Sequence, residues 1–187
     1  MKKRTAARLG LIIIFAAACM FSLFSSMHGD ASGSPQESHL LPVYVTDLGD
    51  VSGFSIIENG SRFTLIQEGD VWQLAQAPDQ EIDQEMIREL AELLSKLPAQ
   101  SMIREPEDLD FYGLADPALS FEITTAESTA ALLVGDEVSH SGLASSSSSE
   151  FPQYYASLSG GTLVYTIGPK LLQLTDQVLQ GISALHK

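Results

Sequence analysis

The stretch from Phe54 to Leu74, FSIIENGSRFTLIQEGDVWQL, decides the fold class of this chain. It contains three short runs of β-branched and aromatic residues, separated by Asn-Gly at 59–60 and Gly-Asp at 69–70. Both dipeptides tolerate the positive φ angles of tight hairpin turns. The stretch therefore predicts an antiparallel meander with strands at Phe54 to Ile57, Arg62 to Ile66 and Val71 to Leu74.

An amphipathic helix is predicted directly after this meander, from Gln84 to Leu97. Its apolar residues recur at steps of three and four, which places them on one face: Met86, Ile87, Leu90, Leu93, Leu94 and Leu97. Asp83 is a suitable N-cap, and Pro98 ends the helix because a proline has no backbone N–H to donate. A second helix is predicted from about Pro169, with one side formed by Leu171, Leu172, Thr175, Val178, Leu179 and Ile182.

The rest of the chain outside the N-terminal region adds short β-prone runs, which favour one α+β domain over residues 41–187. We expect its antiparallel β meander to pack against the amphipathic helix and the C-terminal helix. A short helical turn is predicted to stop at Gly113, and residues 139–150 are predicted to form a mobile serine-rich loop. The additional strands are expected at Val43 to Val45, Leu119 to Thr124, Ala130 to Val134, Phe151 to Leu158 and Thr162 to Ile167.

Residues 1–28 have the pattern of a membrane-targeting segment. Four cationic side chains, the last of them Arg8, precede 19 residues without a charge, from Leu9 to Met27. That length is enough to cross a hydrocarbon core of roughly 30 Å as a helix. Positive charge before the apolar segment leaves the N-terminus in the cytoplasm and sends the following chain outward. The sequence thus predicts a domain at the outer face of the cytoplasmic membrane, anchored through residues 9–27.

The single cysteine leaves three forms of this segment open. Small residues precede Cys19 in Ala-Ala-Ala-Cys, as in a lipoprotein signal whose cysteine becomes lipidated. The apolar residues 20–24 continue beyond it and favour an uncleaved signal anchor, while ordinary signal cleavage is the third alternative. Residues 29–40 begin with a stretch rich in Gly, Ser, Asp and Pro and predict a flexible tether to the domain.

The charge balance of the outer part excludes several partners. Only six of the ten Lys and Arg side chains follow residue 8, against 24 carboxylates, so the net charge there is −18. Such a field repels phosphate backbones and anionic headgroups, and we expect no binding to nucleic acid. Because Cys19 is the only cysteine, the domain has no intramolecular disulfide and must be stable through its core.

An ordered set of short motifs runs from roughly Ile56 to the C-terminus. The set comprises Trp72, Pro78, Asp83 before the helix, the segment around Tyr112, Gly113, Leu114 and Pro117, a strand ending at Gly135, the pair Tyr154 and Tyr155, and Tyr165. This order resembles the prokaryotic family known as domain of unknown function 4340. The resemblance implies an exported or membrane-anchored bacterial protein, and relatives occur near auxiliary components of gliding-motility-type ABC transporters. The family often repeats this module, whereas the chain carries one copy, and the resemblance implies no catalytic residues.

Residue types that carry chemistry do not assemble into a recognisable site. The histidines are widely separated, and the acidic run from Glu105 to Asp110 lacks the spacing of a calcium loop, so we expect neither metal nor cofactor. Trp72 and Tyr112 are expected in the core. Tyr154 and Tyr155 must point to opposite faces of their strand, and the outward one is a candidate for recognition.

The sequence therefore favours a non-enzymatic accessory or binding module of the cell envelope, in which a transporter or another envelope protein is the partner. A structural spacer at the cell surface is one alternative. The other is an envelope hydrolase that uses paired carboxylates as acid and base, drawn from Asp108, Asp110 and Asp136.

Overall fold

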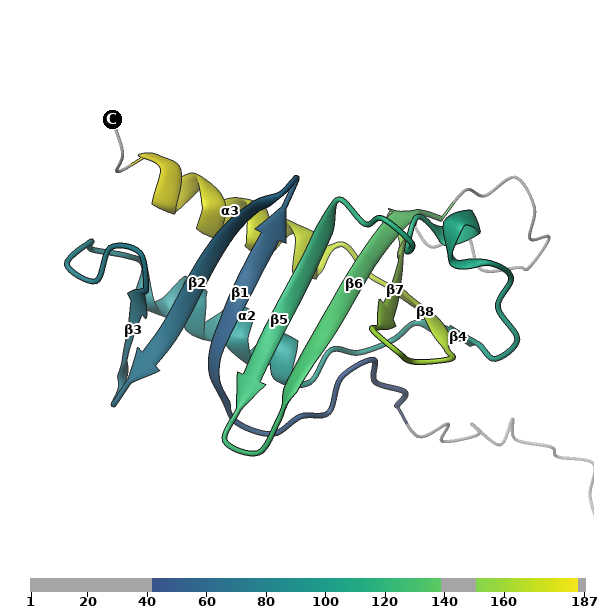
Figure 1. Ribbon diagram of the computed structural model, residues 1–187, viewed down its shortest axis with the longest axis horizontal. Helices are drawn as coiled ribbons and strands as arrows, with labels where there is room; N and C mark the ends of the chain where they lie inside the picture. The colour runs from purple at the N-terminus through teal and green to yellow at the C-terminus, as the bar shows by residue number, and fades with distance from the viewer. Residues whose placement is uncertain (1–41, 139–150, 185–187) are drawn as a thin grey trace, which may run out of the picture. The chain divides into compact units, whose positions relative to one another are not determined.

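A computed structural model describes residues 42–138 and 151–184 (Figure 1). The predicted membrane segment with Cys19, the tether at 29–40 and the serine-rich loop at 139–150 lie outside these residues. No helix within the described ranges has the length and apolar character needed to cross a membrane.

Eight strands form one antiparallel sheet in the order β3-β2-β1-β5-β6-β7-β8-β4, and two helices lie on one of its faces (Figure 1). This confirms the α+β class. The strands are β1 (Val51–Glu58), β2 (Ser61–Glu68), β3 (Val71–Leu74), β4 (Ser101–Ile103), β5 (Leu119–Thr125), β6 (Thr129–Glu137), β7 (Tyr154–Leu158) and β8 (Val164–Ile167).

The predicted meander is confirmed in β1, β2 and β3. The β1–β2 hairpin closes where Glu58 faces Ser61, and the intervening Asn59 and Gly60 adopt φ angles of 47° and 81°. Positive φ at both central residues matches the right-handed twist of the flanking strands. β1 is the centre of the N-terminal part of the sheet, because it pairs with β2 on one side and with β5 on the other.

The helix α2 (Gln84–Ser95) begins where the sequence predicts it and ends two residues earlier. Asp83 is its N-cap, and the Asp83 Oδ1 atom accepts hydrogen bonds from the backbone N–H groups of Glu85 and Met86, each at 3.1 Å. These bonds satisfy two of the donors that the first turn of a helix leaves unpaired. The second helix, α3 (Lys170–Ala184), starts directly after Pro169.

The main core lies between the sheet and the two helices. The strand residues Phe54, Ile56 and Phe121 belong to the same buried cluster as Leu90 and Leu94 of α2. The helix α3 adds an apolar side made of Leu171, Leu174, Val178, Leu179 and Ile182. Successive side chains of a strand point to opposite faces of the sheet, so alternate residues such as Phe54 and Ile56 reach the same core.

Several details differ from the sequence predictions. The strands β7 and β8 begin at Tyr154 and Val164 rather than at Phe151 and Thr162. Residues 43–45 form no strand, and Tyr44 makes only an isolated bridge with Pro98. β6 continues through Gly135 to Glu137, beyond its predicted end at Val134. The strand β4 was not predicted, and it pairs with β8 at the edge of the sheet. The bridge between Tyr44 and Pro98 is made by the Val45 N–H donating to the Leu97 oxygen and the Ala99 N–H donating to the Val43 oxygen. It does not extend into a strand because the Leu97 N–H donates to the Thr46 hydroxyl oxygen at 2.9 Å instead of to a backbone oxygen.

Candidate functional site

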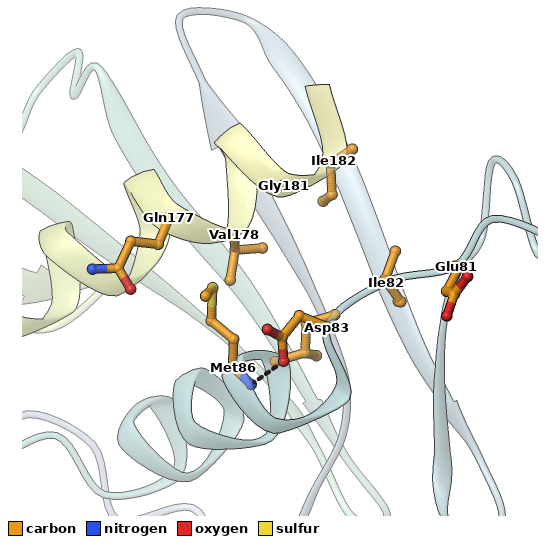
Figure 2. Close-up of a pocket in the computed structure, with 9 residues that line it drawn as sticks. Glu81, Ile82, Asp83, Met86, Gln177, Val178, Gly181 and Ile182 are labelled. Atoms are coloured by element: carbon orange, nitrogen blue, oxygen red, sulfur yellow. Dashed lines mark hydrogen bonds between the residues drawn. The ribbon is translucent and has the colours of Figure 1, made fainter. Parts of the chain in front are cut away.

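An apolar groove lies between the start of α2 and the C-terminal half of α3, with a volume of about 210 Å³ (Figure 2). Figure 2 shows the side chain of Met86 on α2 pointing toward Val178 on α3, and Ile82 lying opposite Ile182. The groove is lined by the apolar Ile82, Met86, Ile87, Val178 and Ile182, by the polar Glu81, Asp83 and Gln177, and by Gly181.

The walls of this groove are fixed by polar contacts at several points. The Asp83 cap sets the first turn of α2, and the Gln80 Nε2 atom donates to the backbone oxygen of Ile182 at 3.2 Å. Farther along the helix pair, Lys170 Nζ lies 2.9 Å from a carboxylate oxygen of Glu89. Both side chains of this ion pair are about half exposed, so it adds little stability and mainly links the two helices.

Gly181 leaves the groove open on the α3 side. A Cβ atom built at Gly181 meets nothing within 4 Å, and the backbone there does not adopt a positive φ. Neither crowding nor backbone conformation therefore requires a glycine. A glycine inside a helix costs roughly 0.5–1 kcal/mol relative to alanine. Gly181 thus lowers the stability of α3, and it leaves free space beside the apolar residues of the groove.

The charged side chains on the rim are acidic. Glu81 and Asp83 line the groove, while Glu85 lies exposed in the first turn of α2. Gln177 is the polar residue that α3 contributes. The arrangement combines an apolar floor with donors and carboxylates at the edge, as binding sites on protein surfaces do.

Two further cavities in the described part of the chain can be compared with the groove. One, of about 330 Å³, lies between α2 and the strands near Trp72 and has Arg88 and Glu92 among its lining residues. The other, of about 220 Å³, lies on the outer face of β1 and β2 near Gly53. Both are more polar or shallower surfaces without an apolar floor shared by two helices, so the α2–α3 groove is the stronger candidate.

The structure places the predicted motif residues in the scaffold rather than in this groove, apart from Asp83. Trp72 is buried in the main core and its ring lies 5.4 Å from that of Phe54. Leu114 is buried, and Pro117 precedes β5. Tyr165 is partly buried against the main core. Expectations of core packing for Trp72 and Tyr112 thus agree with their burial.

Tyr112 belongs to a second, smaller cluster on the opposite face of the sheet. It ends the 3₁₀ turn η1 (Leu109–Tyr112) and packs with Leu114 and Val164. The Tyr112 hydroxyl oxygen accepts a hydrogen bond from the backbone N–H of Glu107 at 3.1 Å. Its ring meets that of Tyr155 edge-on at 4.9 Å. The turn η1 therefore covers the outer face beside β6 to β8.

Two glycines allow η1 to approach the sheet this closely. Gly113 has φ 66°, the left-handed region that ends the turn, and a Cβ there would lie 2.6 Å from the carboxylate of Asp136. A Cβ at Gly135 would lie 2.0 Å from the backbone oxygen of Tyr112. Gly113 thus serves the backbone conformation predicted for it, and Gly135 serves a close approach that its sequence context did not reveal.

Tyr154 and Tyr155 point to opposite faces, as strand geometry predicts. Tyr154 packs against the main core, and Tyr155 is the outward residue that contacts Tyr112. Burial raises the pKa of Tyr155, and the neighbouring Tyr112 raises this pKa further through charge repulsion. Tyr155 thus has a packing partner that shields part of its surface.

The carboxylates considered for hydrolysis do not line any of the three cavities. Asp136 packs beneath Gly113, and Asp108 precedes η1 without making a side-chain cap. Asp110 is exposed within the turn. Over residues 42–138 and 151–184, no group of three or more His, Cys, Asp or Glu side chains is placed to hold a metal ion. The four histidines lie outside these ranges.

Sequence reasoning found the apolar helix faces but missed the groove between them. Met86, Val178 and Ile182 were expected on those faces, whereas Glu81 and Gly181 were not singled out. An isolated glycine within the helical pattern of α3 was the available signal, because such a residue lowers helix stability without a local reason.

The fold and the groove define the class of this protein. It is an α+β domain in which two helices pack on one face of a single antiparallel sheet and form an apolar groove between them. A family model, described as a domain of unknown function (DUF4340), matches residues 72–182. The chain belongs to this family, which confirms the resemblance drawn from its motifs. No curated protein and no solved structure matches it.

Proposed function

We propose that this protein is a non-enzymatic accessory or binding module of the bacterial cell envelope, and that the groove between α2 and α3 binds its partner. The observation that carries the proposal is the apolar groove, in which Ile82 and Met86 are partly exposed beside the space that Gly181 leaves open. Apolar surface exposed in a groove is unfavourable in water unless a ligand or partner covers it. The groove is therefore the surface of the described domain best suited to recognition.

The proposed location rests on the N-terminal sequence. Cationic residues precede the uncharged segment 9–27, which is long enough to anchor the chain with the domain outside the cytoplasmic membrane. Lipidation at Cys19 is an alternative form of the anchor. The strong negative charge of the outer part suits a soluble domain that avoids the anionic membrane surface. A transporter or another envelope protein is the proposed partner, in keeping with what the family resemblance implies.

The groove also favours the binding module over the two alternatives, the structural spacer and the envelope hydrolase. A spacer needs length and solubility, and an apolar groove contributes to neither. A hydrolase that uses Asp108, Asp110 or Asp136 needs two carboxylates in one cleft, whereas none of the three lines the cavities described above. Binding is the function that makes use of the groove.

Site-specific photo-cross-linking in intact cells tests the proposal. A photoreactive amino acid is placed at Gln177 on the groove rim of the full-length protein. The control carries it at Ser183, which is exposed and lies about 200° around α3 from Gly181. We expect an envelope protein, identified by mass spectrometry, to cross-link from position 177 and not from 183.

A second variant removes the groove without changing the cross-linker. Gly181→Leu fills the open space beside Val178 and Ile182, while Ser183→Leu adds the same side chain outside the groove. We expect the cross-link from position 177 to disappear with the first substitution and to persist with the second. Equal cross-linking from both positions, or no product from position 177, would contradict groove binding and favour the spacer. A parallel Cys19→Ala variant tests lipidation through the mass of the mature protein.

A further inference from the structure

We propose that the groove receives one apolar side chain of a partner polypeptide, and that this anchor residue is flanked by Lys or Arg. The inference rests on the proposed function and adds the chemistry of the segment that binds. It follows from the volume of the groove and from the charges on the two elements that form it.

The volume favours an anchoring side chain over a free small molecule. Sites that enclose a drug-sized ligand usually measure roughly 300–1,000 Å³. The groove has about 210 Å³ and is open to solvent along the joint between α2 and α3. Interfaces between proteins often concentrate their binding energy where one large side chain enters a pocket of this kind. A single apolar residue of a partner therefore fits both the size and the open shape.

The charges around the groove select cationic neighbours for that residue. The segments that form it, residues 79–86 and 176–182, contain five carboxylates and no Lys or Arg. These carboxylates belong to Asp79, Glu81, Asp83, Glu85 and Asp176. The N–H groups of the first turn of α2 partly stabilise the negative charge of Asp83, whereas Glu81 and Glu85 are exposed to solvent. Complementary charge at a rim speeds association and rejects partners of the wrong sign.

Nearby cations do not neutralise this rim. Arg88, farther along α2, lines the separate cavity near Trp72, and Lys170 pairs with Glu89. Over the described residues, five Lys and Arg side chains stand against 21 carboxylates, a difference of −16. Two copies of the domain therefore repel each other, which argues against a second copy as the occupant. A basic segment of another protein is the occupant that the charges favour.

Methyl NMR with defined peptides tests this chemistry directly. Full-length protein, labelled at the methionine methyl groups, is placed in nanodiscs of uncharged lipid so that basic peptides do not bind the bilayer. The Met86 methyl group reports on the groove, and Met102 on β4 serves as the internal reference. Three short capped peptides are compared: Leu flanked by lysines, Leu flanked by glutamates, and Asn flanked by lysines.

We expect only the peptide with Leu and lysines to shift the Met86 resonance in a saturable way, and this shift should weaken as salt increases. Glu81→Gln should weaken that binding about two- to five-fold, the scale of one exposed charge interaction. Glu127→Gln removes an equal charge in the β5–β6 turn and should leave it unchanged. Gly181→Leu should abolish the shift, with thermal unfolding used to confirm that the variant is folded.

Equal binding of the lysine and glutamate peptides, or no shift of Met86 with any peptide, would overturn the inference. These outcomes are distinguishable from failure of the proposed function. A groove-dependent cross-link in cells, together with no preference for lysine peptides, would keep the binding module and reject the basic partner. Absence of the cross-link would instead reject the function on which the inference rests.

Discussion

The side-chain amide of Gln84 pairs with both backbone groups of Trp72. The Trp72 N–H donates to Gln84 Oε1 at 2.8 Å, and Gln84 Nε2 donates to the Trp72 oxygen at 2.9 Å. Trp72 lies on β3, one of the two edge strands of the sheet. The amide of Gln76 similarly contacts the backbone of β2, at Thr64 N and Arg62 O, each at 3.3 Å. Two glutamines thus occupy hydrogen-bonding groups that an exposed edge would offer to another chain.

Gln84→Met should destabilise the domain by about 2 kcal/mol, because it removes two hydrogen bonds worth about 1 kcal/mol each while keeping a similar side-chain size. It should also increase self-association through β3. Urea unfolding and sedimentation velocity measure the two effects. Gln173→Met, on the exposed surface of α3, is the control and should change neither. Identical behaviour of the two variants would show that the amide does not protect the edge.

Gly135→Ala should destabilise the domain by about 3 kcal/mol, since its Cβ would lie 2.0 Å from the backbone oxygen of Tyr112 and would force η1 away from β6. The near-ultraviolet circular dichroism of the Tyr112–Tyr155 pair should change with it. Gly181→Ala is the matched control, because it adds a methyl group in open space and should instead stabilise by about 0.5–1 kcal/mol. A Gly135→Ala variant as stable as the natural protein would refute the close approach.

Asp83→Ala should cost about 1 kcal/mol, because the first turn of α2 loses an acceptor for the N–H groups of Glu85 and Met86. Asp83→Ser retains a capping oxygen and should lose less. Chemical unfolding of the three proteins ranks them. If Ala and Ser variants were equally unstable, the loss would have to come from the carboxylate charge rather than from the cap.

Alkaline pH should destabilise the domain through Tyr155. Burial and the nearby Tyr112 raise the pKa of Tyr155 in the folded protein, so the folded state keeps its proton at a pH where the unfolded chain has lost it. As pH rises above about 10, the ordinary tyrosine pKa, proton release then favours unfolding. Melting temperatures at pH 8 and pH 10.5 should show a smaller alkaline loss for Tyr155→Phe. Tyr165→Phe retains Tyr155 and should keep the loss of the natural protein.

Local sequence signals were enough to predict α2 and the β1–β3 meander. Asp83 and the three- and four-residue apolar spacing determine where α2 begins, and Asn59 and Gly60 determine where the first hairpin turns. These signals lie within the elements that they shape. These elements could therefore be predicted without knowing which distant segments of the chain contact each other.

Elements that depend on distant partners could not be predicted in this way. The three residues of β4 have too short a pattern to indicate a strand, and they adopt one because Ser101 faces Thr166 across the sheet. The groove is a similar case, since Ile82 and Ile182 meet only after α2 and α3 dock on the sheet. Gly181 was a signal available in the sequence, but the sequence does not indicate which residues surround this glycine in the fold.

The β1–β5 pairing is the place where two parts of the chain join, one made of β1 to β3 with α2 and the other of β5 to β8 with β4 and α3. On the helix side the same two parts meet at the groove. A segment bound there would touch both and would clamp them together. Occupancy would then appear far from the groove, as slower hydrogen exchange of the amides that pair Ser55 with Glu122 in the middle of the sheet.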